Sequence, residues 1–78
     1  MAEILVYGAD WCGDCRRSKR LLERRGVEFS WIDVEADPRA AEEARRVSGR
    51  RNIPVIVMPG GEVLVEPSDP ELDGRLRA

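Results

Sequence analysis

The chain has 78 residues, two cysteines, no histidine and a net charge of −2. This length suits one small domain over residues 1–78, and two cysteines exclude a disulfide framework because they form at most one bond. A structural zinc site needs four ligands, usually Cys or His, so we expect no bound metal. No apolar run is long enough to cross a bilayer and no signal peptide opens the chain, so we expect a cytoplasmic protein.

The first part of the chain predicts a strand, a helix and a second strand. Gly26 follows the helical segment, where a C-terminal cap is expected. Phe29 and Trp31 alternate in the second strand, so we expect both in the core. The predicted elements are a strand over residues 3–7, a loop over 8–10, a helix over 12–25 and a strand over 28–34.

The second part carries clear helix signals. Asp37 and Pro38 predict a helix start, with Asp as the cap and Pro at the first helical position. Gly49 predicts its end, and Ser68 with Glu71 forms the pattern of a capping box. The predicted elements are a helix to residue 48, a strand over residues 53–58, a turn over 59–61, a strand over 62–65 and a short last helix.

The order of these elements is β-α-β-α-β-β-α. A helix joins the first two strands, which predicts that they are parallel with a right-handed crossover. The last two strands are joined by a tight turn and predict a hairpin. The sequence therefore predicts an α/β protein of the thioredoxin-like class, with a four-stranded mixed sheet and three helices.

The strongest motif is Trp11-Cys12-Gly13-Asp14-Cys15, which lies between the first strand and the first helix. A Cys-x-x-Cys pair in this context is typical of a thioredoxin-like redox centre. The helix N-terminus carries unpaired N–H groups and a partial positive charge, which favour a thiolate. The second thiol lies one turn away, close enough to form a disulfide with the first. The motif therefore predicts thiol–disulfide chemistry.

The two cysteines are expected to have different roles. Cys12 is the predicted nucleophile, with its sulfur nearer the solvent, and Cys15 is the inward-facing resolving thiol. The basic residues of the helix favour the Cys12 thiolate, whereas Asp10 and Asp14 oppose it, so we expect moderate activation. In a dithiol cycle Cys15 attacks Cys12 to release the product and forms the Cys12–Cys15 disulfide. In a monothiol cycle a small thiol completes the reaction instead.

Segments along the whole chain are similar to one known family. They are residues 7–15, Lys19 and Leu22, residues 33–35, residues 53–55 and residues 64–68. The chain resembles the glutaredoxins, and most closely their actinobacterial mycoredoxin branch. The resemblance implies a cis bond between Ile53 and Pro54. This bond would place the Ile53 backbone beside Cys12, where an extended substrate could pair with it.

Other residues are candidates for substrate binding. Trp11 is expected to be partly exposed beside the redox pair, while Tyr7 is expected mainly to pack. Ser68 and Asp69 lie at the start of the last predicted helix, which is expected to lie near the redox pair. They are binding candidates, although capping is a sufficient role for them. Arg50-Arg51 is either an anion-binding pair or a solvated loop.

One segment departs from the ordinary glutaredoxin pattern. Glu66-Pro67 stands where glutaredoxins carry two glycines that help to hold glutathione. Pro67 has no N–H to donate, and Glu66 would repel the carboxylates of glutathione. We therefore expect no tightly bound cofactor, and mycothiol rather than glutathione as the thiol co-substrate. The expected partners are oxidised or mycothiolated proteins, with no nucleic acid or membrane, and a monomer is expected.

Three other functions remain open. One is a thioredoxin-like electron donor to a dedicated enzyme such as ribonucleotide reductase. Another is an iron–sulfur cluster carrier, which the dithiol motif disfavours, because such carriers mostly have one motif cysteine. The third is an interaction domain without catalysis. A basic run between Arg16 and Arg25 does not by itself make a nucleic-acid footprint, because the total charge is balanced.

Overall fold

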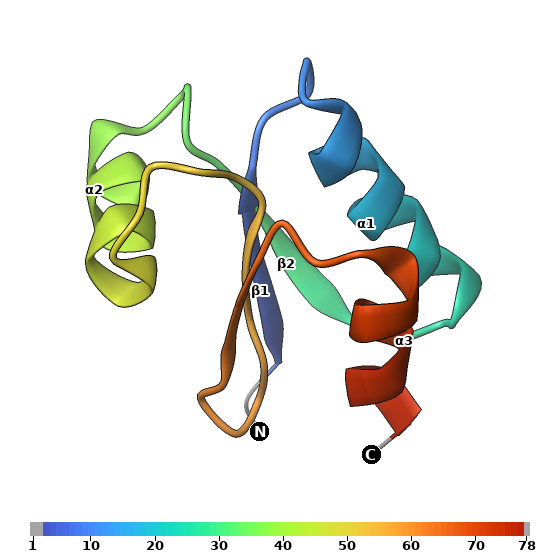
Figure 1. Cartoon of the computed structure of the whole chain (residues 1–78). Coiled ribbons are helices and arrows are strands. Elements are labelled where there is room, and N and C mark those ends of the chain that lie inside the picture. Colours follow the sequence, from blue (N-terminus) through green and yellow to red (C-terminus); the bar gives the residue numbers. More distant parts are fainter. Residues whose placement is uncertain (1–2, 78) are drawn as a thin grey trace.

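The computed structural model describes residues 3–77 (Figure 1). Its elements follow the predicted order β-α-β-α-β-β-α. They are β1 (Ile4–Gly8), α1 (Gly13–Arg24), β2 (Phe29–Asp33), α2 (Pro38–Ser48), β3 (Val55–Val57), β4 (Val63–Val65) and α3 (Asp69–Arg77). No helix within residues 3–77 is both long and apolar enough to span a membrane.

The four strands form one mixed sheet in the order β2-β1-β3-β4. β1 pairs in parallel with β2, with Val6 opposite Trp31. β3 is antiparallel to both of its neighbours, β1 and β4. The predicted fold class is therefore confirmed, including the parallel first pair and the terminal hairpin.

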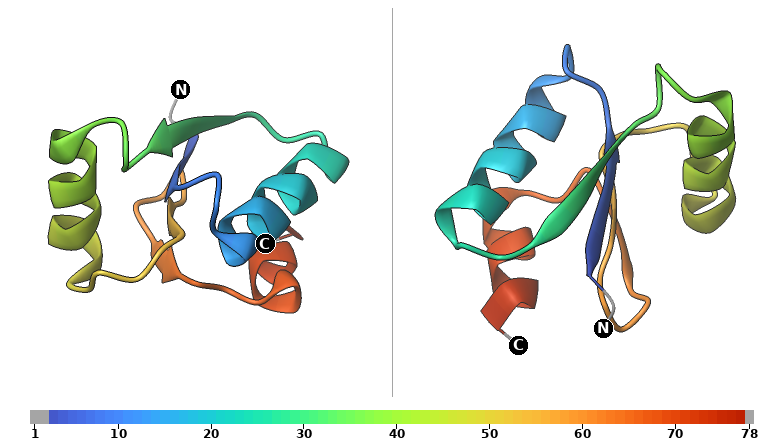
Figure 2. Two further views of the ribbon diagram at one scale, coloured as in Figure 1. Left: turned by 90° about the horizontal axis from the view of Figure 1, so that it is seen from above. Right: turned by 180° about the vertical axis from the view of Figure 1, so that it is seen from behind.

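Helices cover both faces of the sheet, with α1 and α3 on one face and α2 on the other (Figure 2). Alternate residues of β1 therefore enter two different cores. Val6 packs with Leu22 and Leu72 beneath α1 and α3, whereas Tyr7 packs with Ala44 beneath α2. A fully buried Leu or Val stabilises the fold by about 1.5–3 kcal/mol, so both cores fix the sheet that supports the cysteines.

The ends of the helices confirm most of the local signals. Asp37 caps α2 by accepting the Arg39 N–H at 3.0 Å, and Gly49 ends it with φ 72°. Ser68 and Glu71 form the predicted capping box: the Ser68 N–H donates to Glu71 Oε1 at 2.9 Å, and the Glu71 N–H donates to Ser68 Oγ at 3.2 Å. These groups satisfy backbone donors that the first turn of a helix leaves unpaired.

Three predictions about the elements need correction. Cys12 is the N-cap of α1 and not its first helical residue. The third strand is shorter than residues 53–58, because it begins only at Val55, after Pro54. Phe29 and Trp31 are half-buried and not fully in the core, because β2 is an edge strand of the sheet.

Candidate active site

Cys12 lies where the β1–α1 loop meets the helix. Its Sγ accepts a hydrogen bond from the Cys15 backbone N–H at 3.3 Å, as an N-cap side chain does. The Cys12 Sγ–H also points to the carbonyl oxygen of Ile53, 3.9 Å away. Cys12 is 9% exposed and lines an open hollow, whereas Cys15 is fully buried, so Cys12 is the cysteine nearer the solvent, as expected. The same N–H would stabilise a thiolate at this sulfur.

Cys15 lies beneath Cys12 and is fully buried. The two cysteines form a small cluster with Ala9, and Trp31 and Ile53 pack against it. Burial, followed by the hydrogen bond with Cys12, raises the pKa of Cys15 to about 12. Both cysteines are free thiols in this structure. The pair therefore consists of one thiol that reaches a hollow and one that is held protonated at neutral pH.

Gly8 makes room for this arrangement, a role that the sequence analysis missed. A Cβ atom at Gly8 would lie 2.9 Å from Cη2 of Trp31 and 3.0 Å from Sγ of Cys15. The Trp31 ring would have to move, because protein Cβ atoms essentially never approach other heavy atoms to less than 3.0 Å, and Cys15 Sγ would have to shift by a few tenths of an ångström. A glycine at the end of a strand pattern is the signal that could have revealed it, because it often marks close packing.

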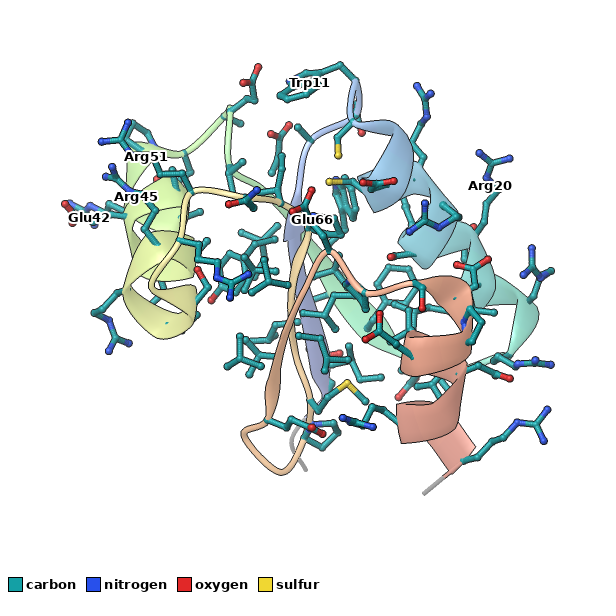
Figure 3. The ribbon with its side chains drawn as sticks, viewed as in Figure 1. Trp11, Arg20, Glu42, Arg45, Arg51 and Glu66 are labelled. Carbon is teal, nitrogen blue, oxygen red and sulfur yellow. The ribbon has the colours of Figure 1, made fainter. Side chains whose placement is uncertain are left out.

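The hollow over Cys12 has a volume of about 450 Å³. Trp11, 65% exposed, stands on its rim, and Glu66 and Arg51 come from segments on its other side (Figure 3). Its lining residues are Trp11, Cys12, Gly13, Asp14, Arg51, Asn52, Ile53 and Glu66. Trp11 is therefore exposed, as expected.

The bond between Ile53 and Pro54 is cis, as the resemblance implied. Pro54 is itself buried, and its carbonyl oxygen accepts the Glu66 N–H at 2.9 Å. Ile53 and not Pro54 lines the hollow. Glu66 has φ 48°, a left-handed conformation that is uncommon outside glycine. The available signal for this backbone was the resemblance to the glutaredoxins, whose pattern implies glycine at this position.

Arg17 links the start of α1 to the start of α3. Its guanidinium donates to Asp14 Oδ1 at 2.7 Å, to Asp69 Oδ1 at 3.1 Å and to the Pro67 carbonyl at 3.1 Å. Asp69 is therefore already engaged, and Ser68 is used in the capping box. Neither residue lines the Cys12 hollow. Arg17 was missed because its partner Asp69 lies 52 residues away in the chain.

The remaining candidates lie further from the sulfur atoms. Tyr7 is buried among the residues beneath α2, as expected, and burial followed by the charge of Glu43 raises its pKa. Arg51 lines the Cys12 hollow, whereas Arg50 lines neighbouring hollows. Within residues 3–77 there is no group of three or more side chains suited to hold a metal ion.

The comparisons with known proteins agree with this geometry. The family model for glutaredoxin matches residues 4–64. A glutaredoxin relative from Mycobacterium tuberculosis is 32% identical over 76 residues, which are 96% of this chain and 90% of the relative. The glutaredoxin-like protein NrdH of Escherichia coli is 41% identical over 54 residues, which are 69% of this chain and 65% of NrdH.

Solved structures give the same result. A glutaredoxin from Archaeoglobus fulgidus has a TM-score of 0.89 and 29% identity, over 100% of this chain and 89% of its own. The Escherichia coli NrdH-redoxin has a TM-score of 0.77 and 31% identity, over 91% of each chain. Family model, relatives, fold and paired thiols agree, and the chain belongs to the glutaredoxin family of thiol–disulfide oxidoreductases.

Proposed function

We propose that this protein reduces protein disulfides and mixed disulfides through Cys12, with a low-molecular-weight thiol as co-substrate and no tightly bound cofactor. The observation that carries the proposal is the hydrogen bond from the Cys15 N–H to Cys12 Sγ at the floor of an open hollow. Such a donor favours the thiolate, which is the attacking form. Transient disulfides of this kind are typical of the cytoplasm, which we propose as the location.

The proposed reaction begins when the Cys12 thiolate attacks one sulfur of the substrate disulfide. A bond forms between Cys12 and that sulfur, and the other sulfur leaves as a thiolate that takes up a proton. Cys15 then loses its proton and attacks Cys12 Sγ, which releases the second substrate thiol and leaves the Cys12–Cys15 disulfide. Two molecules of the small thiol reduce this disulfide and become oxidised to their own disulfide. In the monothiol route, the small thiol attacks in place of Cys15.

The proposed substrate contacts are Trp11 on the rim and the backbone of Ile53 beside Cys12. Pro54 would act by holding the Ile53 backbone toward the sulfur, because its own side chain is buried. Ser68 and Asp69 would act indirectly. Their links to Glu71 and Arg17 hold the chain segment that carries Glu66. We propose that the protein acts as a monomer without nucleic-acid or membrane partners.

Mycothiol is the proposed thiol co-substrate. Glu66 lines the hollow over Cys12 at the place of the glycines that approach glutathione in other glutaredoxins. Its carboxylate opposes the carboxylates of glutathione, whereas the hydroxyls of mycothiol tolerate an acidic wall. Arg51 lines the same hollow and offsets part of this charge. The Mycobacterium tuberculosis relative comes from the actinobacteria, the group of the mycoredoxin branch.

A coupled assay tests the proposal. A peptide is prepared as a mixed disulfide with each small thiol, and the protein reduces it in two assays. In one assay the electron source is mycothiol with its reductase, and in the other it is glutathione with its reductase. We expect turnover to be faster with mycothiol. Equal or faster turnover with glutathione would reject mycothiol, while the absence of turnover in both systems would reject the monothiol-type reaction.

A thioredoxin-like electron donor is the second candidate. It is favoured by the similarity to the Escherichia coli NrdH-redoxin, a glutaredoxin-like protein with a thioredoxin-like activity profile. The substitution of Glu66-Pro67 for paired glycines also suits a protein that has lost glutathione binding. Direct reduction of the Cys12–Cys15 disulfide by a thioredoxin reductase with NADPH, without any small thiol, would favour this candidate over the first.

A further inference from the structure

The basic side chains of α1 divide into two groups. Arg17 pairs with Asp69 of α3 at 3.1 Å, and Arg25, the C-cap residue just after α1, pairs with Asp73 at 2.6 Å. The second group has no carboxylate within ion-pair distance among residues 3–77. We call this second group the α1 basic stripe, and it consists of Arg16, Lys19, Arg20 and Arg24.

The α1 basic stripe begins beside the redox site. Arg16 lies one turn beyond Cys12, and its Nη1 donates to the carbonyl of Asp10, just before Trp11 and Cys12, at 3.2 Å. Arg16, Arg20 and Arg24 follow at intervals of four residues, which places them successively along the helix over about 12 Å. All three are exposed, and Figure 3 shows Arg20 pointing away from the body of the molecule.

The stripe borders a hollow of about 420 Å³ next to the redox site. Trp31 forms part of it, with the Lys19 Nζ 4.6 Å from the centre of its ring. Three cations of the stripe, Arg16, Lys19 and Arg20, line this hollow together with two acids, Asp10 and Glu23, which leaves an excess of one positive charge. This local excess contrasts with the net charge of −2 for the chain.

We infer that the α1 basic stripe binds an acidic segment of the protein whose disulfide reacts at Cys12. This inference rests on the proposed function and names the kind of partner. A protein chain held at Cys12 must extend away from the sulfur, and α1 offers it a charged track that begins one turn away. Carboxylates on the partner complement unpaired cations and speed the encounter. The balanced total charge, with 13 basic and 15 acidic residues, argues against nucleic acid as the occupant.

The side chains also separate this surface from the proposed small-thiol site. Glu66 and Asp14 line the hollow over Cys12, and Arg16 and Arg20 line the hollow beside α1. The first hollow is lined by two acids and one cation, Arg51, whereas the second is lined by three cations and two acids, so their net charges differ in sign. An acidic protein segment is therefore drawn to α1, while the small thiol approaches from the side of Glu66.

Single-turnover kinetics test the inference without any reductase or choice of small thiol. The fully reduced protein is mixed with two synthetic peptides, each in a mixed disulfide with 2-mercaptoethanol. One peptide carries Asp and Glu on both sides of its cysteine, and the other carries Asn and Gln at the same places. We expect the acidic peptide to be reduced about 3- to 10-fold faster at low ionic strength, and the difference to vanish near 1 M salt.

Variants locate the effect on the surface. Arg20→Glu should reduce the preference for the acidic peptide to about one, and Arg24→Glu, one turn further from Cys12, should reduce it less. Arg45→Glu is the matched control, because Arg45 is an exposed residue on α2, on the other face of the sheet (Figure 3). It makes the same charge change and should leave the preference intact. The rate with the amide peptide reports any effect of each substitution on Cys12 itself, and the preference is the ratio of the two rates.

Several outcomes would overturn the inference. Equal rates for the two wild-type peptides would reject it, as would equal effects of Arg20→Glu and Arg45→Glu. The wild-type protein could form a dimer that Arg20→Glu dissociates while the peptide preference stays the same. That result would assign the stripe to contacts with a second copy of this chain. The inference would also be rejected if a short RNA bound in a salt-sensitive way and Arg20→Glu left the peptide preference unchanged. If neither peptide were reduced, the proposed function itself would fail.

Discussion

The N-terminal turn of α1 contains two thiols in contrasting surroundings. Cys12, at the cap position, touches a hollow and accepts a backbone N–H, whereas Cys15 lies inside against Trp31 and Gly8. The helix backbone connects them directly, because the N–H that bonds to Cys12 Sγ belongs to Cys15. One helical turn thus keeps one sulfur available for attack and the other protonated. Both residues are cysteines, so the difference in their exposure and protonation arises from packing and from backbone hydrogen-bond donors.

The largest effect expected from this contrast is on turnover. Cys12→Ser should abolish reduction of every disulfide substrate, because among residues 3–77 no other cysteine lines the hollow. Cys15→Ser should keep turnover of small mixed disulfides within a few-fold of wild type and lose the dithiol route. Steady-state assays with a small mixed disulfide and a protein disulfide separate the two. Activity in Cys12→Ser would contradict the assignment of roles.

A second large effect is expected in the pH dependence of thiol labelling. Because burial raises the pKa of Cys15 to about 12, this thiol stays protonated at pH 7, and its reactive ionised form increases as the pH rises toward 12. Iodoacetamide at neutral pH should therefore modify Cys12 and spare Cys15, as mapped by mass spectrometry. Urea-unfolded protein, in which both thiols label at similar rates, is the control. Preferential labelling of native Cys15 near pH 7 would refute the contrast.

An intermediate effect is expected at Gly8. Gly8→Ala places a Cβ against Cys15 Sγ and Trp31, so the free energy of unfolding should fall by about 1–3 kcal/mol. The dithiol route should slow more than the monothiol route, because Cys15 is displaced. Urea unfolding and assays with both substrates measure this. Gly74→Ala is the matched control: that site is open and helical, so the change should stabilise α3 by up to about 1 kcal/mol.

The smallest effect is expected at Arg17. Both groups of the Arg17–Asp14 pair are partly exposed, so its worth is about 0.2–1 kcal/mol. Arg17→Met leaves the Asp14 carboxylate unpaired in the hollow of Cys12, and alkylation of Cys12 at neutral pH should slow by up to about 5-fold at low salt.

The double variant Asp14→Asn with Arg17→Met distinguishes charge from packing. It removes the uncompensated carboxylate and should restore the wild-type labelling rate. Arg17→Lys, which keeps the charge, should remain close to wild type. A rate that stays low in the double variant would show that Arg17 acts by holding the 66–69 segment and not by balancing Asp14.

Local signals in the sequence predicted much of the fold. Asp37 and Pro38 start α2 and Gly49 ends it because caps depend on neighbouring backbone groups, which the local sequence specifies. The strand order is different, because it depends on which segments meet in space. Trp31 has a core-like pattern, yet it is half-buried because β2 lies at the edge of the sheet.

The candidate site also has features that the local sequence predicts and features that depend on contacts between distant segments. The Cys12–Cys15 motif and its position before a helix could be identified from spacing alone. The link from Arg17 to Asp69 spans 52 residues and exists only because α1 and α3 pack on the same face. The burial of Cys12 also depends on Ile53, 41 residues away, whose carbonyl faces the sulfur. Contacts between segments distant in the chain carry no local pattern.

Glu66 has a consequence for how such a protein can diverge. Its φ of 48° is a backbone state that glycine adopts freely and that disfavours other residues by about 1–2 kcal/mol. The codons for glutamate and glycine differ by one nucleotide. A single mutation at this position would therefore relax the backbone and at once remove one of the two carboxylates that line the hollow over Cys12. Under the role in thiol preference that we propose for Glu66, this preference and conformational stability are linked at one codon, where drift toward the more stable residue would alter which thiol is accepted.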